Sequence, residues 1–161
     1  MKVALFSVVG VGIVIGLAVP TAKPQAATPL AVPAAAPTVQ EPPRETVLER
    51  SPGGHFYTFA QVNGEPVRFI VDTGASTIAL SEEDARRAHV PFDPATFEPV
   101  GQGASGIIQG QRVTVGAIDL DGKRGEALSG VVMQGATMSL LGQNYLRRLN
   151  VQIAGDTMTL R

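Results

Sequence analysis

The 161-residue sequence predicts an all-β domain over residues 51–161, a closed, barrel-like fold with one or two short helices. An N-terminal apolar helix and a disordered linker precede it. Short runs that alternate apolar and polar residues follow one another from His55 to the C-terminus, and Gly-rich turns separate them. With 44% apolar residues the chain can fill the core of one such domain, and with no cysteine it has no disulfide framework.

Charge and cysteine content exclude several functions. The 13 Lys+Arg and 14 Asp+Glu residues give a net charge of −1, so the chain lacks the basic balance that nucleic-acid binding requires. Without cysteine there is no thiolate metal site and no cysteine nucleophile, and His55 and His89 lie too far apart in the sequence to suggest zinc. We therefore expect no nucleic-acid partner, no metal and no cofactor.

Residues 1–19 are expected to form a membrane anchor. Val3–Val19 is a run of 17 uncharged residues after Lys2, which as a helix is roughly 25 Å long and just spans a hydrocarbon core of about 30 Å. Lys2 before the run favours a cytoplasmic N-terminus, with the rest of the chain exported. A cleaved signal peptide, with the cleavage site near Ala22 or Gln25-Ala26-Ala27, is the alternative.

Residues 20–50 are expected to form a disordered linker. They contain 7 Pro and 7 Ala and show no hydrophobic period. Closely spaced prolines remove backbone donors and fix φ, so neither a helix nor a strand ladder persists. In a polyproline-like form the linker could hold a domain up to roughly 95 Å from the membrane. A disordered segment with no spacing role is the alternative.

The folded part is expected to open with a β-hairpin. His55–Val62 alternates in polarity, Asn63-Gly64 supplies a tight turn, and Pro66–Val71 returns as the second strand. Ser81 then begins a Ser-x-x-Asp capping pattern, with acidic residues early and arginines late, which predicts a short helix to His89.

Further short elements complete the predicted barrel. A second short helix is expected at Gln143–Arg148, and a terminal hairpin is expected to turn at Gly155-Asp156. The expected strands are Phe97–Val100, Ile107–Val115, Ala117–Leu120, Glu126–Val132, Val151–Ile153 and Thr157–Leu160, with other turns at Gly101–Gly106, Gly116 and Asp121-Gly122.

One carboxylate stands out. Asp72 directly follows the apolar run Phe69–Val71 and precedes a glycine turn. A carboxylate at the end of a buried strand costs solvation free energy unless hydroxyl and N–H groups satisfy it, and Thr73, Gly74 and Ser76 can do so. Asp-x-Gly is also a common turn sequence, so Asp72 could equally serve only as an Asx-type cap.

Two segments downstream favour the catalytic interpretation. Ser139–Gly142 is a second apolar strand that ends in glycine, and the glycine-rich hairpin Val100–Gly106 lies between it and Asp72. Together, Ile-Val-Asp-Thr-Gly-Ala-Ser (70–76) and the later Leu-Leu-Gly resemble the retropepsin-like aspartic proteases, in particular the single-domain, membrane-anchored bacterial members. The resemblance covers residues 55–161 in the order and spacing of that family.

The resemblance implies an aspartic endopeptidase with Asp72 as its catalytic carboxylate. Thr73 would hydrogen-bond across the active site, Gly74 would let the backbone approach the carboxylate, and Ser76 would bind its outer oxygen. A flap over Val100–Ile108 would close on the substrate. The other implied site residues are Ala75 beside Asp72, the flap residues Gly101, Gln102, Gly103, Ala104, Ser105 and Gly106, the motif Leu140, Leu141 and Gly142, and Ile78, Ile107, Ile108 and Leu140 as subsite or core residues.

Aspartic proteases need two carboxylates that share one proton. This chain has one Asp-Thr-Gly, since Asp121-Gly122 and Asp156-Thr157 do not continue the motif. The resemblance therefore implies a homodimer with one Asp72 from each subunit, with the terminal strand Thr157–Arg161 in the dimer sheet.

The expected substrate is a polypeptide, cleaved on the periplasmic side of a bacterial inner membrane, or in the periplasm if the N-terminal segment is removed. Two alternatives remain open. One is a catalytically inactive binding or dimerisation module of the same fold, and the other is a structural β-domain that serves its anchor.

Overall fold

The computed structural model describes residues 42–103 and 106–161. The expected anchor, Val3–Val19, and the linker up to residue 41 lie outside the described residues. Within residues 42–103 and 106–161, no helix is long and apolar enough to cross a membrane. The elements in chain order are β1 Thr46–Glu49, β2 Tyr57–Val62, β3 Glu65–Val71, β4 Ile78–Ser81, α1 Glu82–Arg87, the 3-10 helix Pro94–Thr96, β5 Glu98–Gly103, β6 Gly106–Leu120, β7 Lys123–Met133, β8 Ser139–Leu141, α2 Gln143–Leu146, β9 Val151–Ala154 and β10 Thr157–Leu160.

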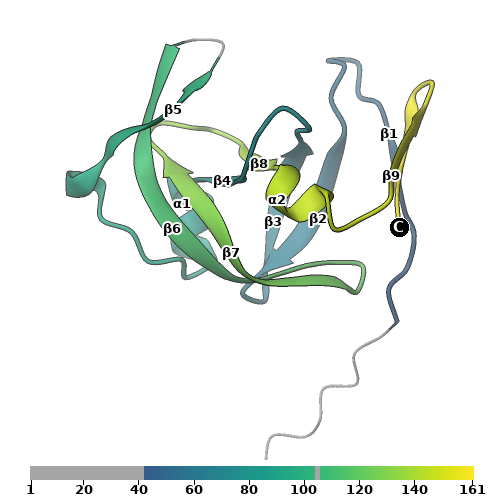
Figure 1. The fold of residues 1–161 in the computed structure, drawn as a ribbon, viewed down its shortest axis with the longest axis horizontal. Coiled ribbons are helices and arrows are strands. Elements are labelled where there is room, and N and C mark those ends of the chain that lie inside the picture. Colours follow the sequence, from purple (N-terminus) through teal and green to yellow (C-terminus); the bar gives the residue numbers. More distant parts are fainter. Residues whose placement is uncertain (1–41, 104–105) are drawn as a thin grey trace, which may run out of the picture. The chain divides into compact units, whose positions relative to one another are not determined.

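The larger sheet closes into a barrel, as the sequence predicts (Figure 1). Its strand order is β2-β3-β8-β4-β7-β6-β5, and β2 also pairs with β6, so the first six strands in that order form a ring that leaves β5 outside. The ring closes where Gln61 pairs with Asp119 and Val62 with Ile118. Two pairings in it are parallel, β3 with β8 and β4 with β7.

The core is apolar, and both short helices bury side chains in it, Ala85 from α1 Glu82–Arg87 and Leu146 from α2 Gln143–Leu146. Helix α1 begins where expected, because the Ser81 side chain accepts a hydrogen bond from the Asp84 N–H at 3.1 Å. Burying large apolar side chains contributes about 1.5–3 kcal/mol each relative to leaving them exposed. The largest fully buried side chains are Tyr145, Phe69, Ile78, Leu80, Ile118, Leu120, Leu141, Leu146, Met158, Leu160, Val62 and Val67.

The expected turn at Gly116 is wrong, because β6 runs without interruption from Gly106 to Leu120. The glycine is needed for close packing. A Cβ at Gly116 would lie 2.8 Å from Asn63 Oδ1, and this oxygen accepts the Ala117 N–H at 2.9 Å. Asn63 follows β2, so the missing side chain lets β2 approach β6 where the barrel closes.

The expected linker ends earlier than residue 50. Thr46–Glu49 form β1, which pairs with β10, and β10 pairs in turn with β9 in a separate three-stranded sheet. The sequence did not predict this strand, because the alternation of polar and apolar residues in Thr46-Val-Leu-Glu49 is short and the segment before it is rich in proline. The folded domain therefore includes residues that the sequence assigned to the linker.

Polar contacts fix both ends of β1 to the rest of the domain. At its start, the buried Lys123 ammonium donates to Arg44 O and to Thr46 Oγ1, and Thr46 donates to Asp121. Burial lowers the pKa of Lys123, and the Asp121 and Asp119 carboxylates oppose that shift.

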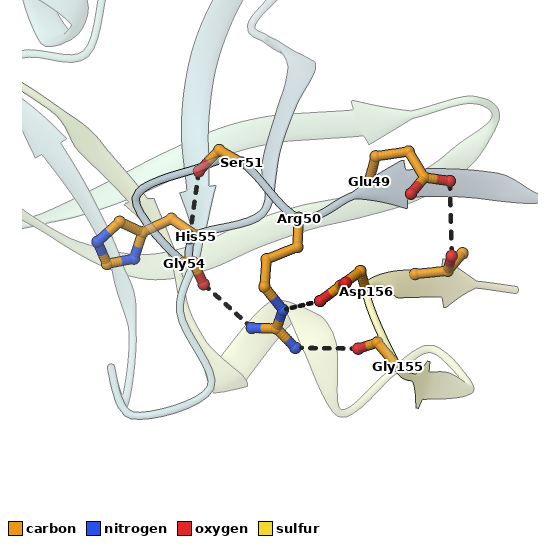
Figure 2. A network of polar contacts seen from close by, with 8 residues as sticks. Glu49, Arg50, Ser51, Gly54, His55, Gly155 and Asp156 are labelled. Carbon is orange, nitrogen blue, oxygen red and sulfur yellow. Dashed lines mark hydrogen bonds and ion pairs between the residues drawn. The ribbon is translucent and has the colours of Figure 1, made fainter.

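Arg50 fixes the other end of β1, as Figure 2 shows. Its guanidinium donates to Asp156 Oδ1 at 3.2 Å, to Gly155 O at 3.2 Å and to Gly54 O at 3.1 Å. The same group lies 4.4 Å from the ring centroid of Phe56, a cation–π contact. Arg50 thus joins β1, the loop before β2 and the turn between β9 and β10.

Candidate active site

Two neighbouring strands place the Asp72 loop. β3 ends at Val71, which is opposite Leu141 in the parallel pairing of β3 with β8. The first residue beyond β3 continues that contact, because the Asp72 N–H donates to Leu141 O at 3.1 Å. The Asp-Thr-Gly and Leu-Leu-Gly segments, which lie far apart in the sequence, are therefore adjacent in the fold.

The Asp72 carboxylate is half-buried and is bound by its own loop. The Gly74 N–H donates to Asp72 Oδ1 at 2.8 Å, and the Ala75 N–H donates to Asp72 O at 3.3 Å. A Cβ at Gly74 would lie 3.2 Å from Oδ1, so glycine permits the short approach. Within the described part of the chain Oδ2 accepts no hydrogen bond, and Ser76, which was expected to bind the outer oxygen, instead accepts the Asn144 N–H of α2 at its carbonyl.

Helix α2 supports the Asp72 loop through hydrogen bonds, a role that the sequence did not predict. The backbone N–H groups of Gln143 and Asn144 donate to Ala75 O at 2.8 Å and to Ser76 O at 3.1 Å. The Gln143 side chain adds a third contact, donating from Nε2 to Thr73 O at 3.0 Å. The carbonyls of Thr73, Ala75 and Ser76 all accept hydrogen bonds from α2, so this helix holds the loop in position.

The Asn144 side chain links the loop to the barrel wall. Its Oδ1 accepts the Ile78 N–H at 3.0 Å, and its Nδ2 donates to Ser129 O at 2.6 Å. Asn144 therefore joins α2, β4 and β7 at the point where the Asp72 loop enters β4. The only sequence signal for this role was an amide residue soon after the Leu-Leu-Gly glycine.

At Gly142 the Leu-Leu-Gly segment lies directly against the loop that follows Asp72. A Cβ there would lie 2.2 Å from Thr77 O and 2.8 Å from Ala75 O, distances that no side chain tolerates without backbone movement. The glycine at the end of Leu-Leu-Gly is thus required because the loop that follows Asp72 lies directly against it.

We expect Gly142→Ala to lower the free energy of unfolding by about 3 kcal/mol, because the added methyl group must displace backbone atoms. Chemical denaturation measures the change. Gly53→Ala is the matched control, since a Cβ there meets no atom nearer than 3.8 Å, and it should change stability by less than about 0.5 kcal/mol. Equal losses in the two variants would contradict the close packing described for Gly142.

The expected flap is a hairpin of β5 and β6. Gln102 pairs with Ile107 and Gly103 with Gly106, and Ala104 and Ser105 at the tip lie outside the described residues. Figure 1 shows the hairpin extending from the barrel. Ile107 is 68% exposed, so the hairpin presents an apolar side chain to solvent.

A cavity of about 240 Å³ lies between the Asp72 loop and this hairpin. A small apolar cluster of Ala79, Val131 and Met133 forms part of its wall. Leu140 and Ile108, expected as subsite or core residues, both line it, whereas Ile78 is fully buried in the core. The lining residues are Gly74, Ala75, Ser76, Thr77, Ala79, Val100, Gly101, Gln102, Ile108, Val131, Met133 and Leu140.

A closed barrel that sets an Asp-Thr-Gly loop against a Leu-Leu-Gly turn, beside a hairpin-covered cavity, defines a retropepsin-like fold. Comparison with known proteins agrees. Residues 58–148 match the family model described as "gag-polyprotein putative aspartyl protease". The chain therefore belongs to the retropepsin-like aspartyl protease family.

A solved bacterial structure shows the same fold. The crystal structure of a retropepsin-like aspartic protease from Rickettsia conorii is 32% identical and has a TM-score of 0.57, covering 73% of this chain and 89% of that chain. A more distant match is EIAV protease complexed with the inhibitor HBY-793, which is 20% identical with a TM-score of 0.47, over 56% of this chain and 84% of that chain.

Two curated relatives are similar in sequence. One is an uncharacterized protein in the cobV 5′ region of Sinorhizobium sp, 32% identical over 132 residues, or 77% of this chain and 54% of the relative. The other is an uncharacterized protein of Rickettsia prowazekii (strain Madrid E), 31% identical over 104 residues, or 65% of this chain and 45% of the relative. The chain spans about half the length of these curated relatives.

Proposed function

We propose that this protein is an aspartic endopeptidase that acts as a homodimer, with Asp72 of each subunit in one active site. The observation that carries the proposal is the Asp72 loop. Its carboxylate is held at Oδ1 by the Gly74 N–H, and residues 74–77 of the same loop line the cavity under the hairpin. Membership of an aspartyl protease family supports the same chemistry.

The second carboxylate has to come from a second copy. Two aspartates about 3 Å apart share one proton, because both cannot ionise at that separation. The ionised one removes a proton from a water molecule, whose oxygen attacks the peptide carbonyl carbon, while the protonated one donates to the carbonyl oxygen. The tetrahedral intermediate then breaks its C–N bond, and the leaving amine takes up the proton that the first carboxyl group received from water. A hydroxyl group of the intermediate returns a proton to the second carboxylate, which restores the pair.

The cavity suggests which side chains the substrate carries. The apolar side chains of Met133, Leu140 and Ile108 line it beside glycines of the hairpin. Ser76, Thr77 and Gln102 add polar groups to the lining. A volume of about 240 Å³ has room for an aliphatic or aromatic side chain. We therefore propose an extended polypeptide substrate with an apolar residue next to the scissile bond.

We also propose that Val3–Val19 anchors the chain in a bacterial inner membrane, with the protease domain on the periplasmic side. The support is the uncharged run itself and the Pro/Ala-rich segment after it. Anchoring in one plane raises the effective concentration of the subunits, which favours dimerisation without any further contact. Release into the periplasm after signal cleavage is the alternative.

Peptide-library cleavage by the purified protein, from acidic to neutral pH, tests the proposal. We expect cuts next to apolar residues, and inhibition by a peptide with a hydroxyl-bearing tetrahedral centre in place of the scissile carbonyl, since such a group imitates the transition state. A folded dimer that cleaves no peptide in the library would instead favour the inactive binding module.

A further inference from the structure

The segment between β7 and β8 forms one wall of a second cavity. Residues 134–138 connect Met133, the last residue of β7, to Ser139, the first residue of β8. A cavity of about 570 Å³ lies between this segment and the hairpin of β5 and β6, and it shares Ile108 and Met133 with the cavity beside the Asp72 loop. Its other lining residues are Gly103, Gly106, Ile107, Gln109, Gln134, Gly135 and Ala136. The position of the 134–138 segment therefore sets the width of this cavity.

The 134–138 segment depends on neighbouring elements for its position. It belongs to no helix or strand, and Gln134, Gly135 and Thr137 are exposed. In Figure 1 it runs from the end of β7 to β8, on the side of the barrel from which the hairpin extends. The Gln134 N–H donates to Gln109 O at 2.9 Å and ties the start of the segment to β6. Segments with few buried contacts open readily, so contacts from outside decide where this wall stands.

Two carboxylates of helix α1 supply such contacts. Glu82 Oε1 accepts the Gly135 N–H at 3.3 Å, and Asp84 Oδ2 accepts the hydroxyl of Ser139 at 2.6 Å. Both acidic residues lie in the first turn of α1, which follows β4 directly. Because β4 and β7 are parallel neighbours, α1 begins beside the end of β7. The helix therefore holds the segment near its start and at the residue that follows its end.

The contact at Ser139 is part of a buried chain of hydrogen bonds. Ser139 has no exposed surface, and its Oγ accepts the Ser81 N–H at 3.0 Å while donating to Asp84. A hydroxyl buried in this way needs its partners. The Asp84 side chain is only 14% exposed, and Arg87 donates to its other oxygen and balances its charge. The carboxylate is thus fixed from the helix side and cannot follow the segment if the segment moves.

We propose that Glu82 and Asp84 are positioning residues, which hold the 134–138 segment and the neighbouring Leu140 so that the protein selects substrates by the size of an apolar side chain. This inference rests on the proposed endopeptidase function. Leu140 follows Ser139 directly and lines the cavity beside the Asp72 loop. When an apolar wall is fixed, one missing methylene group of the substrate lowers kcat/KM by about 10-fold or more. A wall that can move adapts to the smaller side chain, and the discrimination is lost.

Glu82→Ala and Asp84→Ala test the proposal in the full chain. The readout is the ratio of kcat/KM between a peptide with leucine next to the scissile bond and the same peptide with alanine there. We expect each substitution to lower this ratio by about 10-fold, through a higher KM for the leucine peptide, with kcat changed by less than about 2-fold. The rate constant should persist because neither substitution touches the bonds between α2 and the Asp72 loop.

Conservative and neighbouring variants separate positioning from a general loss of structure. Glu82→Gln keeps an oxygen that can accept the Gly135 N–H, so it should keep the selectivity of the wild type. Glu83→Ala is the matched control, because Glu83 lies in the same turn, is exposed and makes no hydrogen bond or ion pair within the described residues. Arg86→Ala removes the exposed ion pair with Glu82 but not the contact with Gly135, and should also behave as the wild type.

A second measurement does not depend on cleavage. Amide hydrogen exchange of Gly135 should be faster in Glu82→Ala than in the wild type, and unchanged in Glu82→Gln and Glu83→Ala. Asp84→Ala leaves the buried Ser139 hydroxyl without its acceptor, so chemical denaturation is measured with it. Glu82→Ala removes only a contact at the exposed Gly135, and it decides the test alone if Asp84→Ala does not fold.

The outcomes distinguish this inference from the proposed function. If the wild type cleaves peptides and folded Glu82→Ala keeps the same selectivity, the positioning role is rejected and the protease function stands. Equal Gly135 exchange in Glu82→Ala and the wild type, an equal loss of selectivity in Glu83→Ala, or a loss confined to kcat would also reject the positioning role. A folded dimeric wild type that cleaves no peptide would reject the protease function, and the selectivity role with it, whatever the exchange of Gly135.

Discussion

Asp72→Asn is expected to lower the rate of peptide cleavage by about 10³-fold or more while leaving the fold and the dimer intact. The active site loses both ionisable carboxylates, because each subunit of the proposed homodimer supplies the same residue, so no group remains to take the proton from water. The fold should persist because Asn Oδ1 can still accept the hydrogen bond that Gly74 donates to Asp72 at 2.8 Å. Steady-state kinetics and light scattering measure the two effects.

Asp93→Asn is the control for this substitution. Asp93 is exposed and caps the 3-10 helix through the Ala95 N–H, a bond that Asn also makes, so we expect full activity. If Asp72→Asn kept measurable cleavage, the carboxylate would serve only as a turn cap. If it kept binding to a partner while wild-type protein showed no cleavage, the inactive binding module would be the better description.

The position of the Asp72 loop in the fold was predictable because its sequence signals are local. Strand β3 ends at Val71 immediately before the carboxylate, and the Asn63-Gly64 turn fixes the hairpin that leads into it. Leu140–Gly142 gave a second local signal, and the fold places the two side by side. The support from Gln143 and Asn144 was hidden, because an amide side chain that binds residues nearly 70 positions away leaves no local pattern.

The lack of a local sequence pattern also explains why strand β1 was not predicted. β1 lacks a strong alternation, and its partner strand follows more than 100 residues later, as in the pairing of Thr46 with Leu160. Its other anchor, Lys123, is 79 residues from Arg44, the residue whose carbonyl it binds. A lysine in a turn sequence after Asp121-Gly122 is ordinarily exposed, so only the folded structure reveals that it is buried.

Removing β1 is expected to destabilise the domain severely. A chain that begins at Ser51 lacks the Arg44 carbonyl and the Thr46 hydroxyl, and so leaves the Lys123 ammonium without these two acceptors. A hydrogen bond to a charged group contributes about 1.5–3 kcal/mol. The β10 edge, which pairs with Thr46–Glu49, is uncovered at the same time.

A chain that begins at Pro42 is the matched comparison, since it keeps every contact of β1. Thermal unfolding of the two should differ by on the order of 10 °C, with the shorter chain melting lower. The shorter chain should also aggregate more readily, because an unpaired β10 edge accepts strands from other molecules. Adding Lys123→Met to it should restore part of the loss, since no ammonium group is then left without its two lost acceptors. Equal melting temperatures would show that β1 contributes nothing to the stability of the fold. If Lys123→Met restored none of the lost stability, the loss would come from the uncovered strand edge rather than from the charge.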